Sequence, residues 1–435
     1  MEEIQKKIKH KFNRFLRIIG PGLITGAADD DPSGIATYSQ AGAKFGYGQL
    51  WTIILMYPLM VAVQEACARI GAVTGKGIAA VARKNYSKTI LFAVVFLVVL
   101  ANTINIGADI GAMIASIELM FPTPGIVIAL FFILFMLFLE VFASYKIYAK
   151  ILKYLSLTLL VYPTTAIIVG QNWSEVLRAT FVPNIEFNSG FFFLLTGLLG
   201  TTISPYMFFW QASEEVEEEI EQDRLPQTGG KPKISRYFIK NLRIDNAFGM
   251  LFSNIITWFI IITTASVLNK NGITEIKSAA DAASALEPLV STFPNSGFLA
   301  KTIFASGIVG IGLLAIPVLA GSASYAISEA FKWKEGFSQK FKKAHGFYGV
   351  IIIATIIGLL INFLNFNPMD ALIFTAVFNG VTAVPLIFLI AKISSSEKIM
   401  GEYKSGKLSK ALVWLTFIVM IFSSIVMFAT ILAGK

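Results

Sequence analysis

Long apolar stretches alternate with short polar ones along almost the whole chain. Crossing about 30 Å of hydrocarbon takes about 20 apolar residues, and eleven stretches reach or approach that length. Their limits are 18–43, 47–70, 90–118, 125–143, 151–170, 190–212, 246–268, 302–330, 347–365, 370–391 and 411–433. The pattern predicts an all-α integral membrane protein with about 11 transmembrane helices.

Lys and Arg gather in alternate loops. If the N-terminus is cytoplasmic, the inner loops hold 30 of the 36 Lys and Arg residues. Cytoplasmic loops are normally the ones enriched in these residues. We therefore expect a multi-pass protein of the cell (inner) membrane with its N-terminus in the cytoplasm and its C-terminus outside.

Composition excludes most soluble classes of protein. Of the 435 residues 55% are hydrophobic and 14% are charged, whereas a soluble domain is about 25% charged. A single Cys and two His rule out an intramolecular disulfide and a histidine-rich metal site. We expect contact with lipid and no nucleic acid.

The first span is interrupted by polar residues. Its middle reads Asp29, Asp30, Asp31, Pro32, Ser33, Gly34, and Pro and Gly both disfavour a continuous helix. Irregular backbone at membrane depth is tolerated only where it is buried in protein or lines a cavity. The sequence therefore predicts a break that faces an interior site.

The three aspartates are expensive in a membrane. Each costs about 2.5 to 3.5 kcal/mol at a helix centre, so their presence points to a function. Three consecutive helical residues fan through about 200°, so they cannot all face one point. We expect Asp31 to be the main ligand and Asp30 the second, with Asp29 facing a crevice or capping a helix.

The sixth span repeats the interruption. Pro205 lies in its middle, among Gly200, Thr201, Thr202 and Ser204. Matching interrupted helices in two halves indicate an inverted repeat with its substrate site at the midplane. The whole chain, 1–435, would then be one transmembrane domain, with repeat one over about 17–170, repeat two over about 190–391 and an extra helix over about 411–433.

The chemistry at the breaks predicts a cation site. Asp31 supplies a negative charge, while the Thr201 carbonyl, the Ser204 hydroxyl and backbone carbonyls near Gly34 could add neutral oxygens. Oxygen ligands without thioether or imidazole suit hard divalent cations such as Mg²⁺ or Mn²⁺. The ion would be the transported substrate, and no cofactor is expected.

Other intramembrane polar residues have two interpretations each. Asn102, Asn105 and Asp109 share one face of the third span, where they could line the pathway or join helices. Asn379 could line the cavity or serve helix packing. The acidic run from Glu214 to Asp223 is expected to be a solvated helix end, with a cation-attracting vestibule as the alternative.

These residues resemble the NRAMP family of divalent metal transporters. The likeness extends over spans one to ten and is strongest in GPGLITGAADDDPSG and IATYSQAGAKFGYGQLW, where the family has an Asp-Pro-Gly-Asn break. The resemblance implies a LeuT-like fold with 5+5 inverted repeats and broken helices 1 and 6. It also matches Asp109 to a family aspartate.

The departures from the family pattern concern metal and proton chemistry. The family Met-Pro-His of the sixth helix falls on Ser204, Pro205 and Tyr206, and a second family histidine falls on Gln211. A family glutamate falls on Ala112. The chain is therefore similar to the magnesium transporters of that superfamily, and Tyr206 and Gln211 take pathway or coupling positions.

We expect a transporter that moves a divalent cation by alternating access, and not an enzyme. The nearest alternative is a cation-coupled symporter of a small organic solute. An intramembrane aspartyl protease using Asp31 and Asp109 is a further alternative, but the Gly-x-Gly-Asp context typical of those enzymes is absent. We expect a monomer.

Overall fold

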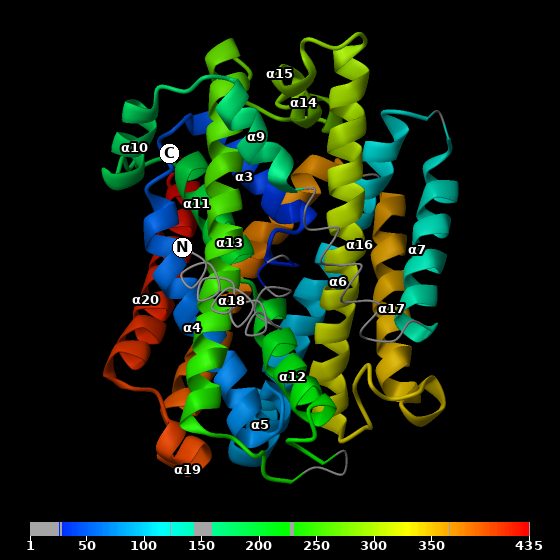
Figure 1. Cartoon of the computed structure of the whole chain (residues 1–435), viewed down its shortest axis with the longest axis vertical. Coiled ribbons are helices and arrows are strands. Elements are labelled where there is room, and N and C mark those ends of the chain that lie inside the picture. The colour runs from blue at the N-terminus through cyan, green and yellow to red at the C-terminus, as the bar shows by residue number, and fades with distance from the viewer. Residues whose placement is uncertain are drawn as a thin grey trace, which may run out of the picture.

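The computed structural model describes residues 26, 28–121, 123–142, 159–226, 230–364 and 366–434. Within them the chain is a bundle of helices that run up and down between two ends (Figure 1). Eight of the described helices, counting an interrupted pair as one, are long and apolar enough to cross a membrane.

Each of the eleven predicted spans contains a described helix, although parts of the first, fourth and fifth spans (18–25, 27, 143 and 151–158) lie outside the described residues. The first five spans contain α3 (Pro32–Phe45), α4 (Thr52–Thr74), α6 (Lys88–Glu118), α7 (Gly125–Phe142) and α9 (Val161–Ile168). The sixth contains α11 (Ser189–Thr202) and α12 (Pro205–Glu221). The last five are α13 (Arg236–Val267), α16 (Ser296–Phe331), α17 (His345–Ile361), α18 (Pro368–Ser395) and α20 (Lys407–Leu432). The predicted all-α membrane fold is confirmed.

Short helices close the two ends of the bundle. At one end lie α10 (Trp173–Phe181), α14 (Ala279–Ser284) and α15 (Glu287–Val290), and at the other lie α5 (Ile78–Asn85) and α19 (Glu397–Met400) (Figure 1). The hydropathy pattern predicted none of them, because each is too short to leave a membrane-length signal.

Two helices extend nine or ten residues beyond their predicted limits. Helix α13 begins at Arg236, ten residues before its predicted start, because the Ser235 side chain caps it by accepting from the Phe238 N–H. Helix α12 continues to Glu221 and carries the acidic run. The expectation that this run is solvated is wrong, since Glu215, Glu217 and Glu219 are buried there.

The broken helices lie at the centre of the bundle. Helix α3 packs against α13, α18 and α11, and α11 packs closely on α18. Helices α6 and α16 flank this centre, with α7 and α17 beyond them, while α20 lies on the opposite side against α4, α11 and α18 (Figure 1). The added helix α20 therefore supports the two repeats from outside.

Candidate functional site

The first break is short and is centred on Asp31. Residues 28 and 29 are helical, Asp30 forms a bend, and Asp31 has the extended backbone of an N-cap (φ −67°, ψ 171°). Pro32 then occupies the first turn of α3, where its missing N–H costs nothing. The predicted break is confirmed, but it spans two residues, so Ser33 and Gly34 already belong to a helix.

The Asp31 carboxylate is held by neutral donors from three helices. Its Oδ1 accepts from the Ser33 hydroxyl and the Gly34 N–H, each at 2.7 Å, and from the Thr201 hydroxyl at 3.4 Å. Its Oδ2 accepts from the Asn105 amide at 2.7 Å. Five ion pairs occur in the described ranges, and none includes Asp31. The carboxylate is thus fixed in place without being neutralised.

At the second break, the Thr201 side chain makes the contact with Asp31. Helix α11 ends at Thr202, and Ser204 is the N-cap residue of α12. The Ser204 hydroxyl donates to the Gly200 carbonyl at 3.1 Å and to the Thr201 carbonyl. The two predicted neutral ligands therefore contact each other in this conformation, and Thr201 reaches Asp31 with its hydroxyl instead of its carbonyl.

Gly34 allows the two breaks to meet. A Cβ at this position would lie 2.9 Å from the Thr201 hydroxyl and 3.3 Å from Asp31 Oδ1. Gly34 also gives its N–H to Asp31. Its role in the structure is close approach and donation, whereas the sequence suggested a carbonyl ligand from this stretch.

Helix α6 carries the polar face that the sequence predicted. The residues on this face have two different roles. Asn105 donates to Asp31, and Asp109 is fully buried beside the backbone of Ser33 and within electrostatic reach of Asp31. Asn102 instead donates to the Leu319 carbonyl of α16 at 2.9 Å. The pathway interpretation suits Asn105 and Asp109, and the packing interpretation suits Asn102.

The remaining predicted pathway residues are Tyr206, Gln211 and Asn379. The Tyr206 hydroxyl donates to the Ala28 carbonyl at 3.0 Å, which joins α12 to the end of the first half-helix. The Gln211 amide donates to Glu215, one turn further along α12. Asn379 is buried on α18, and no hydrogen bond in the described residues joins Gln211 or Asn379 to Asp31.

Asp29 and Asp30 face a helix that the sequence interpretation did not connect with them. Both are fully buried, and both contact the Ser253 hydroxyl of α13. Asp30 also accepts from the Thr257 hydroxyl at 3.4 Å. The signal for these partners was weak, because Ser253 and Thr257 are small polar residues at i and i+4 in an otherwise apolar helix, a pattern common in helix packing.

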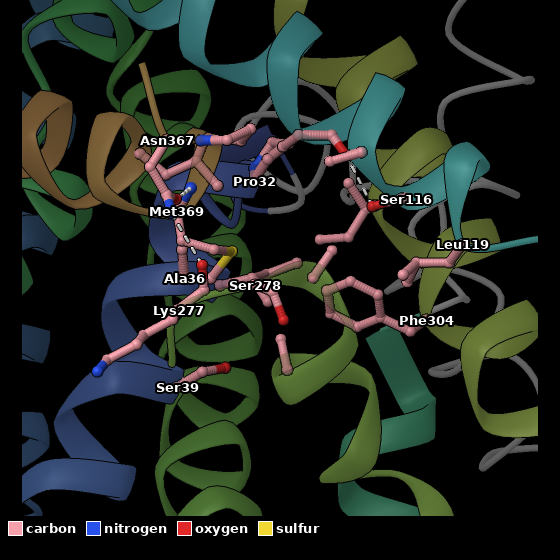
Figure 2. Close-up of a pocket in the computed structure, with 18 of the residues that line it drawn as sticks. Pro32, Ala36, Ser39, Ser116, Leu119, Lys277, Ser278, Phe304, Asn367 and Met369 are labelled. Carbon is pink, nitrogen blue, oxygen red and sulfur yellow. Dashed lines mark hydrogen bonds between the residues drawn. The ribbon is translucent and has the colours of Figure 1, made fainter. Parts of the chain in front are cut away.

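A cavity of about 320 Å³ leads toward the first break (Figure 2). Residues of α3, α6, α14, α16 and α18 line it, and it reaches Pro32, the neighbour of Asp31. Lys277, Ser278 and Asn367 lie among its labelled polar residues, while Phe304 and Leu119 form part of an apolar wall (Figure 2). The cavity gives the break a passage toward the end of the bundle that carries α14.

The side-chain groups beside Asp31 that could ligate a metal are the Ser33 and Thr201 hydroxyls and the Asn105 amide oxygen, all of them oxygen ligands. In the part of the chain that the structure describes, no group of three or more His, Cys, Asp or Glu side chains is arranged to hold a metal. A cation at Asp31 would therefore bind one carboxylate together with hydroxyl or amide oxygens and water. Mg²⁺ retains several waters when it binds, so such a sparse ligand set suits it.

Comparison with known proteins gives consistent matches over nearly the whole chain. The family model "Natural resistance-associated macrophage protein-like" (Nramp) matches residues 22–430. The "Divalent metal cation transporter MntH" of Agrobacterium fabrum is 24% identical over 416 residues, which is 94% of this chain and 86% of that protein. The protein of the same name from Caldanaerobacter subterraneus is 24% identical, over 97% of this chain and 95% of that protein.

Solved structures match the fold over a similar extent. An Eremococcus coleocola manganese transporter, solved in complex with an aromatic bis-isothiourea substituted compound, superposes with a TM-score of 0.73 at 17% identity. The superposition covers 95% of this chain and 86% of that one. Mhp1, a nucleobase-cation-symport-1 family transporter, has a TM-score of 0.60 at 12% identity, with coverage of 95% and 91%. At these identities the likeness is one of fold.

Proposed function

The chain belongs to the Nramp family, and from this premise we propose that it carries a divalent metal cation across the membrane by alternating access, with Asp31 as the main charged ligand. It is a transporter and not an enzyme, and the metal is its substrate. The proteins named MntH that match most of the chain are divalent metal cation transporters. This favours metal over the organic solute that was the alternative.

One observation carries the assignment to Asp31. Its carboxylate is fully buried at the meeting point of two broken helices, and every hydrogen bond that it accepts comes from a neutral group. A buried charge costs several kcal/mol unless a partner compensates it. A transported cation would be that partner, which would bind and leave as the helices around the break rearrange.

The chemistry of the site supports a hard cation, Mg²⁺ or Mn²⁺. Ser204 occupies the position where the family pattern has a methionine, so the sulfur donor is replaced by oxygen. Soft thioether ligands favour softer metals, whereas oxygen ligands favour Mg²⁺, Ca²⁺ and Mn²⁺. Mg²⁺ is therefore the preferred substrate in this proposal, and Mn²⁺ is the second.

One cavity of the described residues approaches the first break. The cavity of Figure 2 runs from Pro32 toward α14, at the end of the bundle that the distribution of Lys and Arg places outside the cell. The described conformation would thus admit the cation from outside. Alternating access requires this cavity to close and another to open toward α5 and α19.

Removal of the Asp31 charge tests the proposal. We expect Asp31→Asn to abolish Mg²⁺ and Mn²⁺ uptake into proteoliposomes, because the amide keeps the size of the side chain but cannot neutralise a divalent ion. The matched control is Glu402→Gln, which removes an exposed carboxylate from the weak pair with Arg236 and should transport normally. Uptake is measured with a metal-sensitive dye inside the vesicles, and melting curves check folding.

Full transport by folded Asp31→Asn protein would contradict the assignment. A pH-sensitive dye in parallel vesicles reports whether protons move with the metal. Calorimetric titration of the purified protein with divalent cations and with amino acids separates metal transport from the organic-solute alternative. Only the true substrate should give a binding heat, and this heat should be absent in Asp31→Asn.

A further inference from the structure

Two further carboxylates meet on the other side of the first break. Asp29 Oδ2 lies 3.2 Å and Asp30 Oδ1 lies 3.1 Å from the same Ser253 hydroxyl. The Thr257 hydroxyl lies 3.4 Å from Asp30 Oδ1. Both aspartates are fully buried, so two carboxyl groups and two hydroxyls lie close together between the first half-helix and α13.

This group is distinct from the surroundings of Asp31. Asp31 takes its donors from α6, α11 and its own helix, whereas Asp29 and Asp30 take theirs from α13. Asp29 ends the first half-helix, Asp30 lies in the bend and Asp31 has extended backbone, so the break turns the three neighbouring aspartates toward two different directions. The absence of a side chain at Gly26 allows α13 to lie close to the first half-helix. A Cβ at Gly26 would lie 2.2 Å from the Gly249 carbonyl oxygen.

The hydrogen bonds in this group leave its charge uncompensated. Four carboxylate oxygens face two hydroxyls, and each hydroxyl has only one hydrogen to give. Asp29 Oδ1 and Asp30 Oδ2 are buried and have no hydrogen-bond partner among the described residues. None of the ion pairs of the described ranges includes either aspartate. A carboxyl group buried in such surroundings either holds a proton or needs a cation beside it.

We propose that Asp29, Asp30, Ser253 and Thr257 form a second cation site, for a hard divalent ion of the same class as the substrate. Two carboxylates match the double charge of such an ion, and two hydroxyls complete an all-oxygen set. The two unpartnered oxygens would be the first ligands. The choice of a divalent ion rests on the proposed function, whereas the existence of the site rests on this geometry.

A second ion beside the first would assist release. Two like charges in the interior of a protein repel each other more strongly than they would in water. In channels, repulsion between ions at adjacent sites helps a bound ion to leave. A cation at Asp29 and Asp30 would therefore loosen the hold of Asp31 on its own ion.

Counting bound ions tests the proposal. Mn²⁺ is the probe, because electron paramagnetic resonance distinguishes free from bound Mn²⁺, and the full chain is studied in lipid nanodiscs. We expect the unaltered protein to saturate at two ions. Asp31→Asn should retain one, and the paired change Asp29→Asn with Asp30→Asn should also retain one. Saturation at a single ion that disappears in Asp31→Asn would overturn the second site and leave the proposed function intact.

A milder substitution guards against misfolding of the paired variant. Ser253→Ala removes the hydroxyl shared by both aspartates and should weaken one of the two binding steps about tenfold, as loss of a supporting group at a metal site does. The control is Ser424→Ala, whose buried hydroxyl donates to a carbonyl of its own helix and should leave both steps unchanged. Two unchanged binding steps in Ser253→Ala would count against the site. If Asp31→Asn loses neither an ion nor transport, the proposed function fails while the second site stands.

Discussion

At the scale of single residues, Asp31 combines a structural role at the start of α3 with the ligand role that we propose for it. It caps α3 by accepting from the Gly34 N–H, which by itself would justify an aspartate before a proline. The cap uses only Oδ1, while Oδ2 turns to Asn105 on a different helix. The cap therefore aims the carboxylate, and the second oxygen faces the helix that carries Asp109.

Ser204 should control the choice of metal. We expect Ser204→Met to shift preference from Mg²⁺ toward Mn²⁺ or Cd²⁺ by about tenfold or more, because a thioether prefers softer ions. Competition between Mg²⁺ and Cd²⁺ during uptake measures the shift. Ser204→Ala is the control, since it removes the hydroxyl without adding sulfur. Equal competition in the methionine variant and the unaltered protein would contradict an ion site at this position.

Glu335 should make stability depend on pH. It lies in the loop between α16 and α17, where burial and the nearby carboxylates of Glu329 and Glu217 raise its pKa to about 9. The folded protein therefore keeps a proton that the unfolded chain releases above about pH 4.5. The stabilising contribution of this proton is complete below about pH 4.5 and is lost as the pH rises toward about 9.

Glu335→Gln should remove that dependence. We expect the variant to exceed the unaltered protein in stability at pH 9 by about 1 to 2 kcal/mol. A pKa shift from 4.5 to about 9 corresponds to about 6 kcal/mol at 1.4 kcal/mol per pKa unit, and partial exposure of the side chain reduces this contribution. At pH 5 the two should be equal. Melting curves from pH 5 to pH 9 measure the difference, and parallel curves would disprove the effect.

At the scale of elements, the prolines show what interrupts a membrane helix. Pro58, Pro317 and Pro385 lie inside the continuous helices α4, α16 and α18. Pro32 and Pro205 instead begin new helices. The preceding residues differ, since Asp31 and Ser204 are of the types favoured at an N-cap, whereas Tyr57, Ile316 and Val384 before the other three prolines are not.

Glycines allow α11 and α18 to pack closely against each other. A Cβ at Gly200 would lie 2.2 Å from both the Ala376 carbonyl oxygen and the Gly380 nitrogen. We expect Gly200→Ala to destabilise the protein by about 1 to 3 kcal/mol or more, because backbone atoms cannot give way as side chains do. Gly307→Ala is the control on α16, where an added Cβ meets no atom within 4 Å. Melting temperatures should fall only in the first variant.

At the scale of the whole molecule, a network around Arg69 and Glu65 connects three segments that lie far apart in the sequence. Arg69 of α4 forms an ion pair with Glu65, at 2.8 Å, and donates to the Tyr403 carbonyl at 2.6 Å and to the Ser405 hydroxyl at 2.9 Å. Arg243 of α13 reaches the same Glu65 at 2.8 Å. The network fastens the start of α20 to both repeats.

Arg69→Met should loosen this attachment. We expect a loss of about 3 to 5 kcal/mol, because the change leaves Glu65 buried with a single, half-exposed partner. The control is Arg236→Met, which breaks the exposed pair with Glu402, at 3.3 Å, and should cost at most about 1 kcal/mol. Thermal unfolding of both variants in detergent measures the contrast. Equal losses would show that burial of the pair is unimportant.

The sequence by itself determined the fold class, the spans and the places where two of them break. These properties depend on local chemistry, since hydrophobic length selects membrane helices and a polar residue before proline ends one helix and begins another. The same logic placed Asp31 at the first break. The limits of the two repeats and the ligand roles of Asp31, Asp30, Thr201, Ser204 and Gly34 stay predictions.

Only the tertiary structure decided which residues meet at the breaks. Asn105 reaches Asp31 across 74 positions of sequence, and Ser253 reaches Asp29 across 224. The buried surroundings of the acidic run on α12 were equally hidden, because its composition resembles a solvated helix. The physical reason is that periodicity fixes the face of a helix, whereas the neighbour of that face depends on how distant helices pack.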